Sequence, residues 1–201
     1  MNSEESTDAF AFTPENQSKA EAFIAKYPKG RQASAVLALL DLAQRQSGGW
    51  VSRAAMEHVA KLLDMPFIRV QEVATFYTML NLKPVGKQLV QLCRTTPCWL
   101  RGSDSIRDAC KRKLGIEVGE TTPDGKFSLV EVECLGACVN APVVQINDDY
   151  YEDLTPEKME DILEKFARGE KPPYGTQIKR QFSAPESGLT TLKGSETAER
   201  A

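Results

Sequence analysis

Two short stretches decide the fold: CRTTPC at residues 93–98 and CLGAC at residues 134–138. They hold four of the chain's five cysteines, spaced C-x4-C and C-x3-C, and 35 residues separate the two pairs. The segments that lead into them, residues 87–92 and 127–133, alternate apolar and polar side chains, a pattern that predicts β-strands. If the two strands are neighbours that end at the same edge of a sheet, the four thiolates meet around one inorganic centre.

The whole sequence of 201 residues allows one large or two small domains. A net charge of -3 gives no indication of nucleic-acid binding. No apolar run approaches the ~18 residues of a membrane span, so direct membrane insertion is not expected. The acidic N-terminal segment resembles neither a secretory signal nor an Arg-rich transit peptide. We therefore expect a reducing compartment, where paired cysteines indicate metal or redox sites before disulfides.

The first half of the chain has the periodicity of short helices. Residues 1–12 are polar, and we expect them to be flexible. Thr13 and Ser52 are candidate helix caps, with Pro14 in a first helical position. Apolar spacing predicts a second helix near residues 33–46 and a fourth that runs from Pro66 to Leu80. Residues 13–85 thus form a predicted helical bundle.

The pattern changes from helical to alternating after Pro84-Val85-Gly86. The second half predicts a strand (87–92), a cysteine loop, a helix (103–114), a strand (127–133) and a second cysteine loop. Two short strands (143–146 and 149–152) and a helix (156–168) follow. This order is typical of a thioredoxin-like domain with a mixed sheet over residues 86–175, and the whole chain is of the α+β or α/β class. Residues 176–201 are polar and predict a tail that is disordered or draped over a partner.

A [2Fe–2S] cluster needs four thiolates, and the two short loops offer donors that can stabilise its negative charge. Thr95, Thr96 and Gly136 are candidate donors to sulfur. Trp99 is a candidate to shield one side of the cluster from water. Arg94 and Arg101 are candidates to stabilise the reduced cluster with their positive charges. Structural zinc bound by the same four cysteines remains an alternative, because the spacings also suit zinc. A C-x-x-C redox motif and the C-x4-C-x2-C run of plant-type ferredoxins are both absent.

The pattern C-x4-C followed by CLGACVNAP at residues 134–142 resembles the thioredoxin-like [2Fe–2S] ferredoxins. The sequence VATFY at residues 73–77 resembles that family's N-terminal signature, and the likeness covers about residues 13–175. Within the family it is most similar to the 24-kDa subunits of NADH:quinone oxidoreductase, respiratory complex I. The resemblance implies four cluster ligands: Cys93, Cys98, Cys134 and Cys138.

The resemblance also implies electron transfer without substrate chemistry of the isolated chain. The expected partners are a flavoprotein subunit that binds FMN and NADH, with the cluster next to the FMN, and other peripheral-arm subunits. The chain has neither a G-x-G-x-x-G fingerprint nor a P-loop for a nucleotide of its own. The implied location is peripheral, on the cytoplasmic side of a bacterial inner membrane or the matrix side of the mitochondrial one. The equivalent subunit of an NAD-linked hydrogenase or formate dehydrogenase, and a zinc-stabilised interaction module, remain alternatives.

Overall fold

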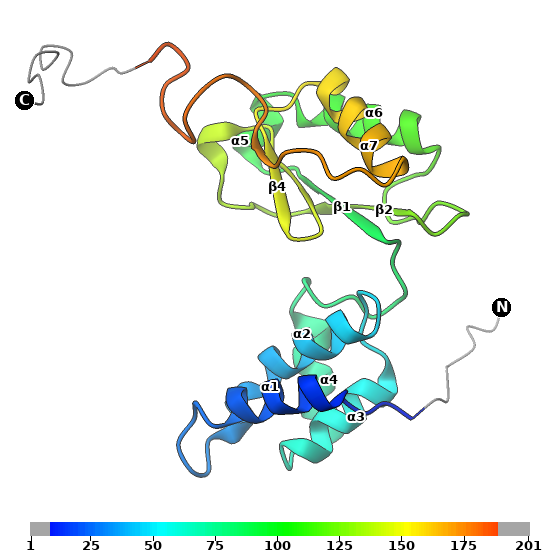
Figure 1. Cartoon of the computed structure of the whole chain (residues 1–201), viewed down its shortest axis with the longest axis vertical. Helices are drawn as coiled ribbons and strands as arrows, with labels where there is room; N and C mark the ends of the chain where they lie inside the picture. The colour runs from blue at the N-terminus through cyan, green and yellow to red at the C-terminus, as the bar shows by residue number, and fades with distance from the viewer. Residues whose placement is uncertain (1–8, 189–201) are drawn as a thin grey trace, which may run out of the picture. The chain divides into compact units, whose positions relative to one another are not determined.

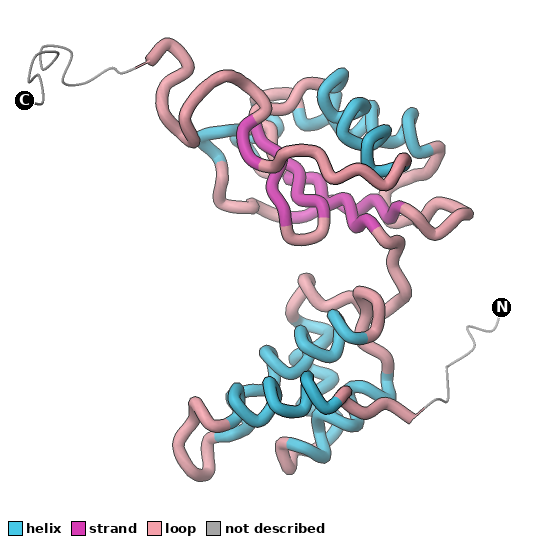
Figure 2. The backbone as a smooth tube through the Cα atoms, viewed as in Figure 1, coloured by secondary structure: helices cyan, strands magenta, loops and turns pink. Residues whose placement is uncertain are grey.

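The computed structural model describes residues 9–188 of the chain, which divides into two compact units between Lys87 and Gln88. The predicted boundary lay two residues earlier, after residue 85. Figure 2 shows that one unit contains helices and the other contains the strands. Each unit has its own buried core. The residues predicted as a flexible N-terminus and a C-terminal tail lie partly outside the described range, at 1–8 and 189–201.

The N-terminal unit consists of α1 (Pro14–Ile24), the 3-10 turn η1 (Gln32–Ala35), α2 (Val36–Gln46), α3 (Arg53–Leu62) and α4 (Phe67–Phe76). Two predicted caps are confirmed. The Thr13 hydroxyl accepts a hydrogen bond from the Asn16 amide, and the Ser52 hydroxyl accepts one from Ala55. These bonds satisfy amides that have no partner within the helix.

The predicted end of the fourth helix was wrong. α4 ends at Phe76, and Tyr77 adopts an extended backbone with φ -87° and ψ 104°. Leu80 nevertheless reaches the helical core, where it is 5% exposed. A side chain with helical spacing can therefore be buried after the chain has already turned.

The second unit contains β1 (Gln88–Cys93), α5 (Thr96–Leu100), α6 (Ser103–Leu114), β2 (Phe127–Val132) and the 3-10 turn η2 (Cys138–Asn140). β3 (Val144–Ile146), β4 (Asp149–Glu152), α7 (Pro156–Ala167) and β5 (Gly175–Thr176) complete it. The strand order is β2-β1-β3-β4-β5. β1 is parallel to β2 and antiparallel to β3, so the sheet is mixed, as predicted.

Helices α6 and α7 lie side by side over the sheet (Figure 1). Both helices and the four longer strands contribute side chains to one core, which includes Leu129, Ile106 and Ile162. Cys110 lies in this core with no exposed surface. Burial raises the pKa of its thiol to about 12, so this fifth cysteine acts as a small buried apolar group.

The first part of the predicted tail packs on the second unit, to which it belongs. Gly175 and Thr176 form β5 beside β4, and the Gln177 amide extends the ladder to the Glu152 carbonyl at 3.0 Å. The prediction started from composition, which is polar from residue 176 onward. Polar side chains here make specific bonds to the folded unit, and composition does not reveal such bonds.

Candidate metal centre

The four paired cysteines sit where β1 and β2 end. Cys93 is the last residue of β1, and it is in register with Val132, the last residue of the parallel neighbour β2. Cys134 follows two residues later. Because parallel strands end at the same edge of a sheet, the topology brings the two cysteine segments together, as the sequence predicted.

The segments themselves are not both loops. Cys98 lies within α5, a five-residue helix that Pro97 helps to start, and not in the predicted open loop. Cys138 opens the turn η2. The first pair is buried, with Cys93 and Cys98 at 2% and 1% exposure, whereas Cys134 is exposed and Cys138 half-buried.

The thiols are arranged as two pairs. The sulfurs of Cys134 and Cys138 are 3.3 Å apart, well beyond the length of a disulfide bond. Cys93 and Cys98 affect each other's pKa, and a charge on Cys93 also affects the pKa of Cys134 and Cys138, so the two pairs lie within electrostatic reach of each other. Within residues 9–188, no three His, Cys, Asp or Glu side chains are gathered as ligands of one metal ion.

In the buried pair, the environment favours ionisation of the first thiol and opposes that of the second. Burial opposes the ionisation of Cys93, but donors outweigh it and lower its pKa; they include the Thr95 hydroxyl, 3.4 Å away, and the backbone of Leu135. Burial raises the pKa of Cys98 to about 12, with a further contribution from the hydrogen bond to Cys93.

In the exposed pair, the Gly136 amide lies 3.4 Å from the Cys134 sulfur, and this bond is the main reason why the pKa of Cys134 is lowered. The pKa of Cys138 is raised, chiefly by its hydrogen bond with Cys134. Gly136 has φ +83°, a left-handed conformation that side chains disfavour. The glycine therefore lets the loop aim its amide at sulfur.

A tyrosine that the sequence did not single out supports the same loop. The Tyr150 hydroxyl on β4 donates to the Leu135 carbonyl at 2.8 Å. That carbonyl belongs to the peptide whose N–H, on Gly136, faces the Cys134 sulfur. Tyr150 thus holds the donor peptide in place, and its ring packs against the small apolar cluster around Cys93 and Cys98. Its place in an alternating strand gave no sign of this role.

The structure places only some of the other candidate residues of the site against the sulfurs. Thr95 and Gly136 face the sulfurs, but Thr96 is exposed. Trp99 is 57% exposed, and the Arg94 guanidinium forms an ion pair with Glu131 at 2.7 Å. Arg101 and Cys138 both line one surface cavity.

The donor set fits a cluster of two irons. A [2Fe–2S] cluster takes two thiolates on each iron, and the two pairs supply soft sulfur ligands in that grouping. Backbone and hydroxyl donors surround the sulfurs, as an anionic cluster requires. None of the helices in the described part of the chain is long and apolar enough to cross a bilayer.

Comparison with known proteins agrees with this geometry. Residues 20–167 match the family model of the thioredoxin-like [2Fe-2S] ferredoxins. A subunit of the NADH-quinone oxidoreductase of Rickettsia bellii is 67% identical over 156 residues, 78% of this chain and 93% of the relative. NADH dehydrogenase [ubiquinone] flavoprotein 2, mitochondrial, of Dictyostelium discoideum is 52% identical over 183 residues, 91% of this chain and 74% of the relative.

Among solved structures, the air-oxidised NAD+-reducing [NiFe]-hydrogenase has a similar fold. It aligns with a TM-score of 0.56 at 18% identity, over 65% of this chain and 23% of the hydrogenase chain. At that identity the likeness concerns the fold alone. The family match and the identity to the oxidoreductase subunits carry the assignment: this chain belongs to the thioredoxin-like [2Fe-2S] ferredoxin family, whose cofactor is a [2Fe–2S] cluster.

Proposed function

We propose that this chain is an electron-transfer subunit of NADH:quinone oxidoreductase and that Cys93, Cys98, Cys134 and Cys138 ligate its [2Fe–2S] cluster. The observation that carries the proposal is the grouping of four thiols into two pairs at the ends of β1 and β2. Identity of 59–67% to NADH-quinone oxidoreductase subunits of two Rickettsia species supports the choice of host complex. When bound, the cluster supplies one-electron redox chemistry.

The chain's own contribution is to bind and tune the cluster. The buried pair excludes water from one side, while the donors from Thr95 and Gly136 stabilise negative charge on sulfur. The more exposed pair brings the other side of the site close to the surface. A cluster near the surface can exchange electrons with a docked partner.

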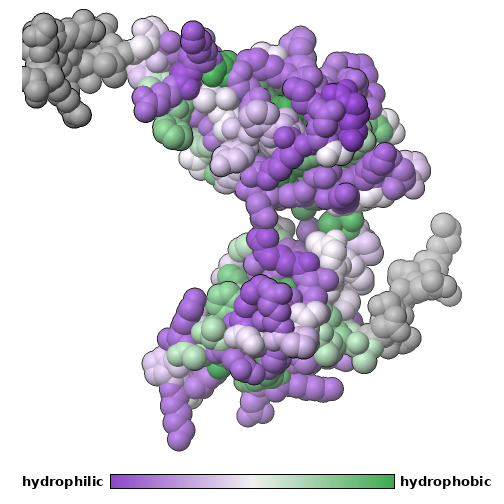
Figure 3. All heavy atoms as spheres, in the orientation of Figure 1, coloured by the Kyte–Doolittle hydropathy of each residue, from purple (hydrophilic) through white to green (hydrophobic). Residues whose placement is uncertain are grey.

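The partner that we propose is the flavoprotein subunit that binds FMN and NADH, with the cluster next to the FMN. Large apolar side chains are exposed beside the ligands: Trp99 and Leu100 follow Cys98, and Val139 follows Cys138. In Figure 3 most of the visible surface is hydrophilic, with separate hydrophobic areas on both units. Exposed apolar groups of this kind favour protein contacts. We place the complex on the cytoplasmic face of a bacterial membrane or the matrix face of a mitochondrial one.

The cluster assignment is tested on the purified full chain. We expect about two irons and two sulfides per chain, visible absorption that dithionite bleaches, and an EPR signal after reduction. Each of the four substitutions Cys93→Ser, Cys98→Ser, Cys134→Ser and Cys138→Ser should reduce cluster content or change the EPR spectrum. Cys110→Ala is the matched control, because this buried thiol lies in the other core of the unit. A colourless protein with stoichiometric zinc contradicts the proposal.

The partner assignment needs a second experiment. Co-expression with the flavoprotein subunit should give a complex that survives purification, and Leu100→Ser with Val139→Ser should weaken it without removing the cluster. Phe182→Ser is the control, because it also removes an exposed apolar side chain. It tests whether the loss of any exposed apolar group weakens the complex. If the double variant retains the complex, the partner does not dock on the apolar side chains beside the ligands.

A further inference from the structure

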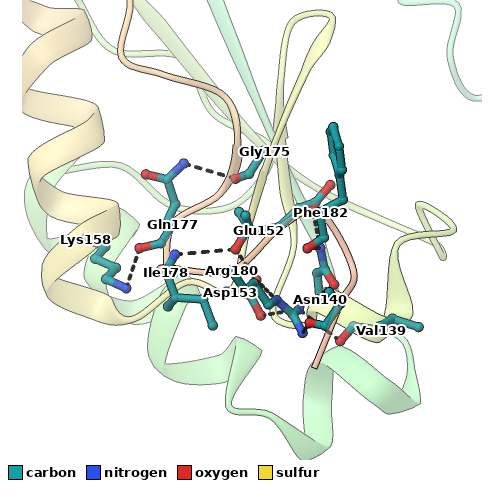
Figure 4. Close-up of polar contacts among 12 residues, drawn as sticks. Val139, Asn140, Glu152, Asp153, Lys158, Gly175, Gln177, Ile178, Arg180 and Phe182 are labelled. Atoms are coloured by element: carbon teal, nitrogen blue, oxygen red, sulfur yellow. Dashed lines mark hydrogen bonds and ion pairs between the residues drawn. The ribbon is translucent and has the colours of Figure 1, made fainter. Parts of the chain in front are cut away.

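An ion pair with little exposure fastens the segment after β5 to Asp153, the residue that follows β4. The Arg180 guanidinium donates to both oxygens of the Asp153 carboxylate, at 2.8 and 3.1 Å. The two side chains are only 9% and 10% exposed. Figure 4 shows Arg180 between Asp153 and Asn140. The charge of Arg180 is thus balanced locally, so its remaining hydrogen bonds serve mainly to fix geometry.

One remaining bond stays local, from Arg180 Nη1 to the Ala184 carbonyl at 3.2 Å, and two others reach the second cysteine segment. Arg180 Nη2 donates to the Asn140 side-chain oxygen and to the Val139 carbonyl, the latter at 3.4 Å. Both residues belong to the turn η2, which Cys138 opens. One planar guanidinium therefore connects the carboxylate of Asp153, beyond β4, to the backbone directly after Cys138.

Asn140 completes the connection. It is 2% exposed, its amide nitrogen donates to the Glu152 carboxylate and to the Phe182 carbonyl, and its own carbonyl accepts from the Asp153 amide at 2.7 Å. The Thr176 hydroxyl donates to Asp153, and Lys158 of α7 donates to the Gln177 carbonyl at 2.7 Å. The segment of residues 175–182, hereafter the strap, is therefore held along its length.

The second cysteine segment needs such support more than the first. Cys93 lies in a strand with neighbours on both sides, and Cys98 is buried, whereas Cys134 is exposed and Cys138 half-buried. The strap contacts the turn that holds Cys138, at the side of the site where neither a strand nor burial holds the cysteines.

We propose that Arg180 is a positioning residue for the cluster: it fixes the backbone after Cys138 and so holds the Cys134–Cys138 pair in the geometry that retains iron. This inference rests on the proposed ligation of the cluster by Cys138. Arg180 acts through Val139 and Asn140 and does not contact the cluster itself. Supporting residues of this kind typically change metal affinity about 10–100-fold when they are removed.

The test uses the full chain with its cluster in place. Arg180→Gln removes the charge and the planar fork, while Arg180→Lys keeps the charge for Asp153 but cannot reach both partners at once. The control is Arg168→Gln, which removes exposed ion pairs with Glu164 and Glu170 at the end of α7. Three quantities are measured: circular dichroism, the rate of bleaching by an iron chelator, and the EPR spectrum of the reduced cluster.

We expect Arg180→Gln to stay folded, to lose its cluster about tenfold faster than the unmodified protein, and to show a shifted or broadened EPR spectrum. Arg180→Lys should be intermediate, and Arg168→Gln unchanged. If Arg180→Gln does not fold, the test uses Arg180→Lys, which should still lose its cluster severalfold faster than the unmodified protein. A folded Arg180 variant with an unchanged loss rate and EPR spectrum overturns the inference. Cys138→Ser distinguishes the two failures: if it keeps an unaltered cluster, the ligand assignment itself is wrong.

Discussion

The hydroxyl of Thr95 offers the sharpest test of how the protein tunes the cluster. It lies 3.4 Å from the Cys93 sulfur and also contributes to the lowered pKa of Cys134. Thr95 precedes α5 with an extended backbone, φ -71° and ψ 166°, and its side chain makes no cap bond to that helix. Thr95→Val therefore removes the O–H donor while it keeps the branched shape and the backbone conformation.

The size of the effect follows from the charge on sulfur. A hydrogen bond to a charged acceptor contributes about 1.5–3 kcal/mol, and we take the low end because sulfur is a weak acceptor at this distance. One-electron reduction changes the total charge of cluster and thiolates from about -2 to about -3, which strengthens the bond by roughly half. The differential is about 0.7 kcal/mol. Since 59 mV corresponds to a tenfold change for one electron, the potential should fall by about 30 mV.

The assay is a redox titration of the full chain with mediators, followed by the EPR signal of the reduced cluster. Thr96→Val is the matched control, because the neighbouring hydroxyl is exposed and should leave the potential unchanged. A Thr95→Val potential within about 10 mV of the unmodified protein, or above it, would falsify the argument that this hydroxyl donates to a cluster sulfur.

Three further substitutions test other parts of the structure. Tyr150→Phe removes the bond to Leu135, so thermal unfolding should show a loss of about 1 kcal/mol and the potential should fall by about 10 mV, because the Gly136 donor is less polarised. Leu39→Ala in the fully buried helical core should cost about 2–5 kcal/mol by denaturant unfolding; a changed EPR spectrum would contradict the separation of the two cores. Ser52→Ala should cost about 1 kcal/mol in the same assay, and no loss would mean that its cap bond is absent in solution.

Features that depend on a few neighbouring residues were predictable from the sequence. The caps at Thr13 and Ser52 are confirmed because a hydroxyl bonds to an amide three residues later. The meeting of the cysteine segments was predictable because it needs only two parallel neighbouring strands. The family and its cofactor followed from the same motifs.

Features that depend on distant partners were not predictable. Periodicity placed Leu80 on a helix because it cannot distinguish a buried helical residue from one that is buried after a turn. Polar composition from residue 176 onward predicted a tail. It missed the strap because Arg180 binds Asn140 and Asp153, which lie 40 and 27 residues away in sequence. Tyr150 likewise binds a carbonyl 15 residues away. Local sequence patterns do not predict hydrogen bonds between residues so far apart.

Tyr150 and Arg180 both support the second cysteine segment, and this has a physical reason. The buried cysteine pair is fixed by elements that leave a sequence signature: a strand and a proline-started helix. The exposed pair lies in a segment with little regular structure, and long-range side chains hold it: Tyr150 on the Leu135 carbonyl before Cys138, and Arg180 on the turn after it. Under the proposed ligation, this loop stays near the surface to exchange electrons, so burial does not secure it. Directional hydrogen bonds from the rest of the fold take over that role, so substitutions there should alter the cluster before they unfold the protein.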